Sequence, residues 1–592
     1  MKQKTFLTLF ILFIAVTIKA QVFLNLDFEK HSSDGHAKGW YQGGEGYNVF
    51  VDTTIFYSGK SSMCISQLRS GKFGAATSTF PFEEAKGKYL KYTGYIKTEN
   101  VTDGCAGLWW RVDGKSGVLN FDNMNDRGVR GTTDWKKYSI EFKINEDPIN
   151  INFGVLMNGS GKAWFDKLQI ELDGKIYEQI EPKEIQITDE QMNWLKSNIN
   201  VFDTSDPKHD NSDLSFLKQI VGNAKIVSLG EGTHGTSEFF KMKHRITKYL
   251  AEEMGFTIFA IEANMPEAKI VNDYILNGIG DPKKALAGLY FWTWNTQEVL
   301  DMIEWMREFN KSKKGRIEFW GFDMQTPNVA VENVEKFFAE HDSSYLPKAK
   351  ADYDKVIESM NEITKMNPRP GNVLIEPVLN YANEVLDYLK AKLPLYKISI
   401  SNDEAEQVLQ DAKIVVQSIE CLMTNSTSRD ESMAVNVEWI INHFGKDTKI
   451  VLWAHNGHVS KMTNHGMKPM GSYLDKKYSK DMIVFGFGFN EGKYTAFGNN
   501  GVGIYTTSSS QSGSLEWILH KTNKDQFIFD LRKAKDNSLF SFLKDDIEFR
   551  SIGAWAMDDA FYKTKIMDEY DAIVYFDKTT PSACFGITNK LK

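Results

Sequence analysis

The spacing of apolar residues changes once along this 592-residue chain, and the change divides it into two regions of different fold class. Between residues 21 and 178, apolar and polar residues alternate in short runs, as they do from Tyr138 to Ile144. From about residue 190 onward, short apolar runs alternate with segments whose apolar residues recur every three or four positions. The first pattern is typical of strands, and the second of strands joined by helices. We therefore predict an all-β domain at 21–178 and an α/β domain at 190–592.

The first region contains enough alternating runs for a two-sheet sandwich. Further runs lie at residues 61–67, 88–97, 104–112 and 149–156, separated by Gly, Asp, Asn and Ser. About eight short strands with such turn residues between them suffice for a β-sandwich or jelly roll. No segment of this region has the spacing of a helix.

The second region predicts a sheet that is rich in parallel strands and flanked by helices. Between its first two apolar runs, apolar residues from Phe239 to Leu250 recur at helical spacing, and Gly255 ends the helix. A strand, a helix and a strand in so short a segment form a βαβ unit, whose two strands run parallel. The predicted strands lie at residues 225–230, 256–261, 316–322, 449–454 and 482–489.

A helical insertion interrupts this pattern at about residues 330–445. The segment is charged and its apolar residues have helical spacing. Ahead of it, Asn295 and Glu298 have the spacing of a capping box that would open a helix at 296–310. The candidate helices of the insertion lie at residues 331–340, 350–365, 372–393, 402–424 and 430–443.

The N-terminus has the features of a secretory signal peptide over residues 1–20. Lys2 and Lys4 precede an apolar stretch at 6–18, and the small residue Ala20 follows it. The stretch is shorter than the roughly 20 residues that span a bilayer, and no later segment is long and apolar enough. We expect a secreted or periplasmic protein without stable membrane insertion; a leader retained as an anchor is the alternative.

Charge and cysteine content narrow the choice of partner. Seventy Lys and Arg against 78 Asp and Glu give a net charge of −8, which disfavours nucleic acid as a partner. The four cysteines, Cys64, Cys105, Cys421 and Cys584, lack the spacing of a metal or redox site. Cys64 and Cys105 would pair if their strands are neighbours, and buried free thiols are the alternative.

Reactive side chains follow four of the five predicted parallel strands. Ligands bind beyond the carboxyl ends of such strands, so these residues are expected to share one edge of the sheet. Four independent strand ends that carry a carboxylate or an imidazole predict a common site. The first strand ends in Glu231 with His234 close behind it, the second in Glu262, the third in Asp323, and the fourth in His455 and His458.

The segment Gly230–Gly235 (GEGTHG) predicts a base for the activation of water. His234 lies where a helix begins, and the positive end of the helix dipole disfavours imidazolium there. A neutral imidazole accepts a proton near pH 7, and Glu231 or Glu262 would stabilise the charge that forms. The alternative is that His234 only caps the helix and Glu231 makes a buried hydrogen bond.

Other residues would complete this site. A second imidazole from the Ile450–His458 segment would protonate the leaving oxygen or stabilise an oxyanion. Arg245 and Arg429 are the cationic candidates for substrate binding, beside Asp323 and His458; for Arg429 the alternative is an ion pair with Asp430 or a strand-end carboxylate. A nucleophilic serine is disfavoured, because no G-x-S-x-G motif occurs and Ser228 lies within a strand.

Several segments of the second region resemble the erythromycin esterase family. They follow the family's order over about 400 residues. The resemblance implies hydrolysis of a macrolide lactone ester without metal or cofactor, with His234 as general base, Glu231 and Glu262 as active-site glutamates, and His455 in the second histidine motif. An ester on a glycoside or polysaccharide is an equal alternative. The matching segments are Gly230–Arg245, Phe259–Ala268, Trp294–Asn310, Phe319–Gln325, Arg429–Asn436 and Trp453–His458, with the phrases at 550–554 and 570–580 behind them.

The first region resembles carbohydrate-binding modules of the galactose-binding-like jelly-roll type, on the segments Asn25–Glu29, Gly39–Trp40 and Ala163–Leu172. Such modules stack exposed aromatic side chains on sugars. The candidates here are Trp40, Tyr41, Trp109 and Trp110, although the last two alternate faces on a strand, so that at least one belongs to the core. The resemblance also implies a structural Ca²⁺, for which Asp27, Glu29 and Asp166 offer oxygen ligands.

Two rival functions remain open on the sequence. Glu231, Glu262 and the three histidines offer enough N and O ligands for a metal-dependent hydrolase. A non-catalytic glycan-binding protein would keep the same residues without turnover.

Overall fold

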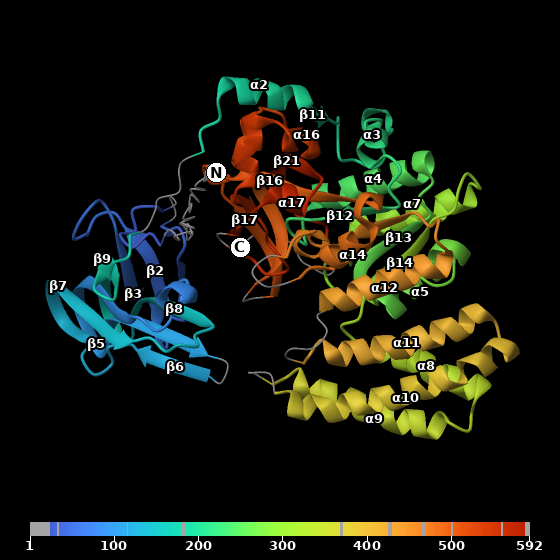
Figure 1. The fold of residues 1–592 in the computed structure, drawn as a ribbon, viewed down its shortest axis with the longest axis horizontal. Coiled ribbons are helices and arrows are strands. Elements are labelled where there is room, and N and C mark those ends of the chain that lie inside the picture. Colours follow the sequence, from blue (N-terminus) through green and yellow to red (C-terminus); the bar gives the residue numbers. More distant parts are fainter. Residues whose placement is uncertain are drawn as a thin grey trace, which may run out of the picture. The chain divides into compact units, whose positions relative to one another are not determined.

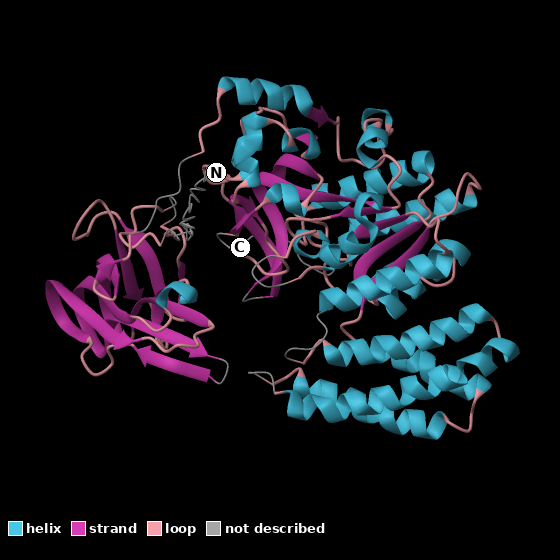
Figure 2. Cartoon of the chain, viewed as in Figure 1, coloured by secondary structure: helices cyan, strands magenta, loops and turns pink. Residues whose placement is uncertain are grey.

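The computed structural model describes residues 24–31, 35–114, 117–178, 185–366, 371–423, 429–463, 468–498, 501–557 and 560–585. The chain divides into two compact units, residues 1–183 and 184–592 (Figure 1). The first unit consists almost entirely of strands, whereas the second mixes helices and strands (Figure 2). The predicted signal peptide lies outside the described residues. Within the described residues, no helix combines the length and the apolar character needed to cross a bilayer.

The first unit is an antiparallel β-sandwich built around one long strand, β5. The first half of β5 pairs with β7 and β9, and its second half pairs with β6 and β8, so β5 joins the two layers of one ten-stranded sheet. Tyr92 from the first half and Trp110 from the second meet in one core, with ring centroids 5.4 Å apart. The strands are β1 (Tyr41–Gly43), β2 (Tyr47–Asp52), β3 (Ser62–Gln67), β4 (Gly74–Thr79), β5 (Tyr89–Gly114), β6 (Gly117–Asp122), β7 (Val129–Lys143), β8 (Asn150–Met157), β9 (Ser160–Leu172) and β10 (Lys175–Ile176).

Two of the predicted sugar-binding aromatics belong to the core of this sandwich. Trp110 is fully buried, and Trp40 is buried with its indole N–H donating to the carbonyl oxygen of Leu24. Tyr41 is 75% exposed, and Trp109 is half-buried on the opposite face of β5 from Trp110. Tyr41 and Trp109 are therefore the two that remain available to a ligand. A short helix that the alternation did not predict, α1 (Phe82–Ala85), joins β4 to β5.

The carboxylates predicted to hold Ca²⁺ bind the backbone in this structure. Glu29 accepts hydrogen bonds from the N–H groups of Lys60 and Ser61, and Asp166 accepts them from Tyr57 and Ser58. Both side chains thus fasten the loop between β2 and β3 to the sandwich, and the calcium site stays a prediction. All four cysteines are free thiols, so the disulfide between Cys64 and Cys105 is not formed.

The second unit contains a sheet with a parallel centre and antiparallel strands beyond it. Along β21-β16-β12-β15-β13-β14 every pair is parallel, while β11, β17 and β18 pair antiparallel. β15 lies between β12 and β13, the two strands of the predicted βαβ unit. The strands are β11 (Ile199–Val201), β12 (Ile226–Leu229), β13 (Ile258–Asn264), β14 (Glu318–Asp323), β15 (Ile450–Trp453), β16 (Met482–Gly498), β17 (Gly501–Thr507), β18 (Gln526–Asp530) and β21 (Ala572–Thr579), with the separate pair β19 (Ile547–Arg550) and β20 (Phe561–Thr564).

Helices cover both faces of this sheet, which explains why its strands are apolar throughout. Alternate residues of β15 enter different cores: Ile450 and Leu452 pack on one face, and Val451 and Trp453 on the other. The first core includes residues of α8–α12, and the second includes residues of α4, α5 and α7, which Figure 1 shows beside β13. These helices are α4 (Ser237–Met254), α5 (Met265–Asn277), α7 (Gln297–Lys311), α8 (Asn328–His341), α9 (Leu346–Ile363), α10 (Asn372–Ser399), α11 (Asn402–Glu420) and α12 (Arg429–Phe444).

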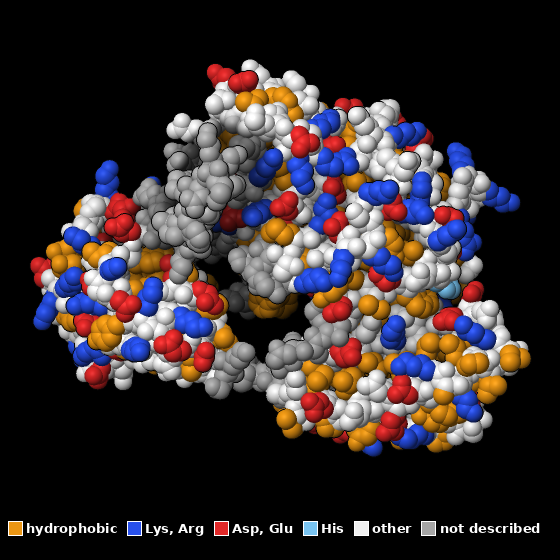
Figure 3. Space-filling model, viewed as in Figure 1, with side chains coloured by type: hydrophobic (Ala, Val, Ile, Leu, Met, Phe, Trp, Pro, Cys, Tyr) orange, Lys and Arg blue, Asp and Glu red, His pale blue; other side chains and the backbone are white. Residues whose placement is uncertain are grey.

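Shorter helices complete the unit. Apolar side chains interrupt the charged surface over α8–α11 (Figure 3). In α10, Val373 is 80% and Ile398 84% exposed. The remaining helices of at least four residues are α2 (Asp189–Asn198), α3 (Leu217–Val221), α6 (Pro282–Ala287), α13 (Asn456–Val459), α14 (Met470–Tyr478), α15 (Leu515–His520), α16 (Arg532–Lys535) and α17 (Ile566–Glu569).

Two local predictions about this unit are wrong. Thr296, not Asn295, caps α7, because its hydroxyl accepts the N–H of Val299. Glu298 binds the Ser237 hydroxyl instead of reaching back to the helix start. Glu262 lies inside β13 and not after it, at the point where the register with β14 shifts, so that its side chain leaves the strand at an irregularity.

Candidate active site

The loop from Gly230 to Gly235 leaves β12 in very little space. A side chain at Gly235 would place its Cβ 2.0 Å from the carbonyl oxygen of Thr495, and one at Gly230 would meet the Asn456 amide oxygen at 2.2 Å. Neither glycine has a positive φ. These glycines are therefore required for the close approach of the Thr495 backbone and of the Asn456 side chain.

This loop joins Glu231 and His234 in a hydrogen-bonded dyad. His234 Nδ1 lies 2.7 Å from Glu231 Oε1, and Glu231 is fully buried. Because a buried carboxylate accepts hydrogen bonds, Nδ1 carries the proton and Nε2 presents its lone pair. The His234 side chain is 14% exposed, and the structure gives Nε2 no hydrogen-bond partner among the described residues.

Two further donors hold the other oxygen of Glu231. Lys243 Nζ lies 2.6 Å and Trp453 Nε1 2.8 Å from Oε2. Burial would raise the pKa of Glu231, but the charge of Lys243 and the bond to His234 lower it, so Glu231 is an anion. Burial in turn lowers the pKa of Lys243 to about 8. The ammonium also lies 4.3 Å from the centre of the Trp453 ring.

A second cluster is centred on Arg429, the first residue of α12. Its guanidinium donates to Glu262 Oε1 at 2.7 Å and to both oxygens of Asp323, at 3.0 and 2.7 Å. These pairs raise the pKa of Arg429 well above its ordinary value, against the effect of burial. Burial acts to raise the pKa of Glu262, but the charges of His458 and Arg429 hold it well below the usual range. The alternative of an ion pair with a strand-end carboxylate is thus the one observed.

His458 joins this cluster through both ring nitrogens. Its Nδ1 lies 2.8 Å from Asp430 Oδ1, and its Nε2 lies 3.1 Å from Arg429 Nη1 and 3.4 Å from Glu262 Oε1. Burial opposes protonation, yet Glu262 and Asp430 together raise its pKa. His458 therefore belongs to the charged rim of the site.

His455 lies between the two clusters as a neutral imidazole. Its Nδ1 accepts the N–H of Gly457, so Nε2 carries the proton and donates to the carbonyl oxygen of Ile552 at 3.3 Å. Burial, with the neighbouring His234 and His458, lowers the pKa of His455 to about 3. Of the two roles predicted for the second imidazole, stabilising an oxyanion fits this state, and protonating a leaving oxygen does not.

The two clusters touch through His455 and Glu262. The rings of His234 and His455 have centroids 5.0 Å apart, and the backbone N–H of His455 donates to Glu262 Oε2 at 3.0 Å. Trp294 lies against His234 edge-on and donates its indole N–H to the Glu262 carbonyl oxygen. Thus Glu231, His234, Glu262, Asp323, Arg429, His455 and His458 all meet at the carboxyl edge of the sheet.

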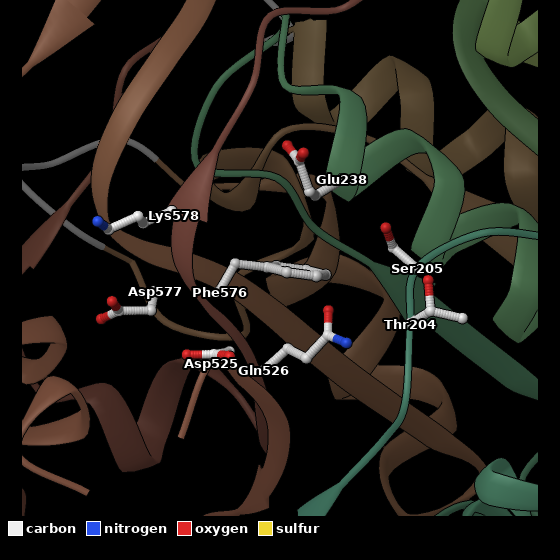
Figure 4. A pocket seen from close by; sticks show the side chains of 8 residues that line it. All are labelled: Thr204, Ser205, Glu238, Asp525, Gln526, Phe576, Asp577 and Lys578. Carbon is white, nitrogen blue, oxygen red and sulfur yellow. The ribbon is translucent and has the colours of Figure 1, made fainter. Parts of the chain in front are cut away.

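Arg245 is the one predicted site residue that the structure places elsewhere. Its side chain is fully buried, and it binds Asp213 with two nitrogens and the carbonyl oxygens of Thr204 and Asp210. It therefore holds the 204–213 loop against α4. That loop forms a wall of a pocket of about 490 Å³, in which Thr204 and Ser205 lie on one side, Asp577 and Lys578 on the other, and Glu238 of α4 and Phe576 between them (Figure 4).

The alternative in which His234 only caps a helix does not fit these contacts. Thr236 is the capping residue of α4, and no side chain caps that helix through a hydrogen bond. Glu231 does make buried hydrogen bonds, as the alternative predicted, but its partners are His234 and Lys243.

A metal would have to compete with a fixed cation at this site. The Arg429 guanidinium already bridges Glu262 and Asp323, where a divalent ion would bind. Among the described residues, three side chains bring possible ligand atoms within 4.8 Å of one another only at Glu340, His341 and Glu404 on the surface. The active-site residues therefore do not fit the metal-dependent alternative.

Sequence reasoning missed several members of the site. Lys243 lies 12 residues from Glu231, and its sequence context is that of an ordinary helix residue. The sequence context of Trp453 and Trp294 is that of core residues. Ile552 contributes only its carbonyl oxygen, which no side chain could reveal. Lys243 does fall within the motif Gly230–Arg245, so the motif was the available signal.

Comparison with known proteins identifies the family. The family described as erythromycin esterase matches residues 251–579, more than half of the chain. The chain belongs to the erythromycin esterase family. The family and its relatives named as hydrolase and esterase support a hydrolase.

Individual relatives are distant but cover the second unit. The type II erythromycin esterase of Escherichia coli is 23% identical over 66% of this chain and 98% of its own. A Bacillus cereus protein of solved structure is 28% identical over 67% of this chain and all of its own, with a TM-score of 0.61. A solved succinoglycan biosynthesis protein is 26% identical over 66% of this chain and 97% of its own, with a TM-score of 0.57.

Proposed function

We propose that this chain hydrolyses a carboxylic ester, with His234 as the general base that activates water. The observation that carries the proposal is the state of His234: Nδ1 is bonded to the Glu231 anion while Nε2 is unpaired among the described residues, on a ring that is 14% exposed. A water molecule within reach of Nε2 would lose a proton to it.

The steps follow from this arrangement. His234 Nε2 takes a proton from water as the water oxygen bonds to the ester carbonyl carbon, and the carbonyl oxygen becomes an oxyanion. Glu231 stabilises the imidazolium that forms, as in the serine-hydrolase triad. The C–O bond to the alcohol then breaks, and the imidazolium returns its proton to the leaving oxygen. Lys243, the ion-pair partner of Glu231, keeps this carboxylate ionised.

The rim cluster would bind the substrate and the charge that develops. Arg429 is a fixed cation whose side chain is 27% exposed, and His455 offers a neutral N–H that is now shared with the Ile552 carbonyl oxygen. Preorganised donors of this kind favour an oxyanion over the ground-state carbonyl. Asp323 and Glu262 hold Arg429 in place.

An acylated glycan and a macrolactone are the two substrate classes to compare. The family and the E. coli relative carry the name of a macrolide esterase, whereas a structural relative is named for biosynthesis of a polysaccharide. The exposed Tyr41 and half-buried Trp109 on the sandwich, with the resemblance of that unit to carbohydrate-binding modules, favour the glycan. The predicted leader at residues 1–20 supports a secreted or periplasmic enzyme.

The test is an ester-hydrolysis panel of macrolides and acylated sugars with wild type and His234→Ala. We expect turnover of at least one class and a loss of kcat of at least about 10²-fold in the variant, with an unchanged circular dichroism spectrum. Hydrolysis that survives exhaustive chelation would agree with the Arg429 geometry. Glycan binding without turnover of any ester would instead support the non-catalytic alternative, and an active His234→Ala would refute the base assignment.

A further inference from the structure

We propose that Phe497, Trp555 and Met557 form a subsite that receives the ring portion of the ester substrate, packing against the C–H face of a sugar or macrolactone ring. The inference rests on the proposed esterase function and names the surface that selects its substrate. None of the three residues belongs to a motif that the sequence analysis linked to the site.

Phe497, Trp555 and Met557 are exposed apolar residues on two segments of this unit that are hydrogen-bonded to each other, and together they are called the apolar group. Trp555 is 57%, Met557 49% and Phe497 36% exposed. The rings of Phe497 and Trp555 meet edge to face, with centroids 4.8 Å apart. Single exposed apolar residues are common, but a fixed group with aromatic members marks a binding surface.

Backbone hydrogen bonds fix this group in place. Phe497 N–H donates to the carbonyl oxygen of Ala554, and Ala556 N–H donates back to that of Phe497, both at 2.8 Å. Tyr494 donates its hydroxyl to the carbonyl oxygen of Met557. A surface held by the main chain costs little conformational entropy when a ligand binds.

The same segments also contact the catalytic loops. Ile552 N–H donates to the Gly232 carbonyl oxygen at 2.6 Å, and the Ile552 carbonyl oxygen accepts the proton of His455. Trp555 lies three positions after Ile552, so the chain between their Cα atoms spans at most about 10 Å. On the other side, Thr495 N–H donates to the Gly235 carbonyl oxygen at 2.9 Å, two residues before Phe497. The apolar group is thus continuous with both loops that carry the histidines.

This continuity selects the occupant. An ester whose carbonyl carbon is attacked beside His234 must extend its acyl or alcohol part outward, and this group is an exposed apolar surface whose segments are hydrogen-bonded to the His234 loop. The indole and phenyl rings offer flat faces without charge, which suit the C–H face of a ring and not a charged group. The substrate class is therefore a ring-bearing ester and not a short-chain one.

Steady-state kinetics of the full chain would test the inference. The substrates are ethyl acetate, an acetylated methyl pyranoside and a 14-membered macrolactone; the variants are Trp555→Ala, Trp555→Phe and Tyr89→Ala, the last removing an exposed aromatic of the first unit. We expect Trp555→Ala to lower kcat/KM about 10-fold on the pyranoside or the macrolactone, through KM, while ethyl acetate changes by less than about twofold. Trp555→Phe should retain most of the wild-type value, and Tyr89→Ala all of it.

The two proposals fail in different ways. Hydrolysis of ring-bearing esters that requires His234 but is unchanged in Trp555→Ala would overturn the subsite and leave the esterase function standing. An equal loss on ethyl acetate and on the ring-bearing esters would also overturn it, because the residue would then act on the catalytic loops. No turnover of any ester by wild type would overturn the function itself. Met557→Ala serves as a second variant if Trp555→Ala does not fold.

Discussion

Lys243 and Arg245 both form buried ion pairs from helix α4, yet only one pair reaches the candidate active site. Because successive residues on a helix are about 100° apart, the side chains of Lys243 and Arg245 point to nearly opposite sides of α4. Lys243 donates to one oxygen of Glu231, and the other oxygen binds His234. Arg245 donates to Asp213 and to carbonyl oxygens of the 204–213 loop. Both pairs join one cation to one carboxylate, and both cations are fully buried, although Glu231 is fully buried and the Asp213 side chain is 8% exposed. The two pairs differ in what else the carboxylate binds. Glu231 binds the histidine of the candidate active site with its second oxygen, whereas both oxygens of Asp213 bind Arg245.

Removing the carboxylate of the first pair should have the largest effect. Glu231→Gln keeps the shape of the side chain but loses the charge that stabilises the imidazolium of His234. We expect kcat on a hydrolysed ester to fall about 10³- to 10⁴-fold. Asp213→Asn is the matched control for the second pair, and its kcat should stay within about threefold of wild type. Equal losses in the two variants would show that the pairs do not differ in role.

Removing the cation of the first pair should affect both activity and stability. Lys243→Met leaves Glu231 buried without its strongest partner, which we expect to cost about 3–5 kcal/mol of unfolding free energy. The unpaired charge of Glu231 then favours the imidazolium form of His234, so the acid limb of the kcat profile should move to higher pH. Chemical denaturation and a pH–rate profile measure the two effects. A variant with lowered stability and an unmoved acid limb would contradict the link to His234.

Removing the cation of the second pair should affect stability alone. Arg245→Met leaves Asp213 nearly buried and frees the 204–213 loop, which we expect to cost about 3 kcal/mol. kcat at a temperature where the variant is folded should stay within about threefold of wild type. A large fall in kcat with an unchanged circular dichroism spectrum would show that Arg245 has a role in the active site.

The residue between the two cations should give the smallest effect, and only in acid. His244 is buried against Trp305, and burial lowers its pKa to about 3. Between about pH 3 and 6.5, His244 is therefore protonated in the unfolded state and neutral in the folded state. The free energy of unfolding falls as the pH falls through that range. His244→Leu should remove up to about 1.4 kcal/mol of this loss per pH unit. Identical slopes of unfolding free energy against pH in variant and wild type would refute it.

Apolar spacing was sufficient to predict five strands of the sheet and the insertion helices, but it did not predict β11, β17, β18 and β21 or the lateral order of the strands. The runs at 225–230 and 449–454 coincide with β12 and β15, because strands buried on both faces must be apolar throughout. Nothing local in either run encodes that β15 inserts between β12 and β13. The predicted capping box of α7 was wrong for a similar reason, because Glu298 accepts a hydrogen bond from the hydroxyl of Ser237, 61 residues away.

The site was predictable where chemistry coincides with strand ends and hidden where it does not. Glu231, His234 and Asp323 follow or end strands, so topology alone placed them together. Lys243 and Arg245 have almost the same sequence context, and only the three-dimensional path of the 204–213 loop assigns Arg245 to structure. The tautomer of His455 depends on the carbonyl oxygen of Ile552, about a hundred residues later, and a backbone group leaves no trace in a sequence.

The most direct test of the central claim is chemical rescue of His234→Ala by free imidazole, measured as ester hydrolysis at pH 7. If the imidazole of residue 234 takes the proton from water, the variant should lose at least about 10²-fold in kcat and regain activity in proportion to added imidazole, while Glu231→Gln should not respond. Wild-type activity in His234→Ala without imidazole would contradict the account.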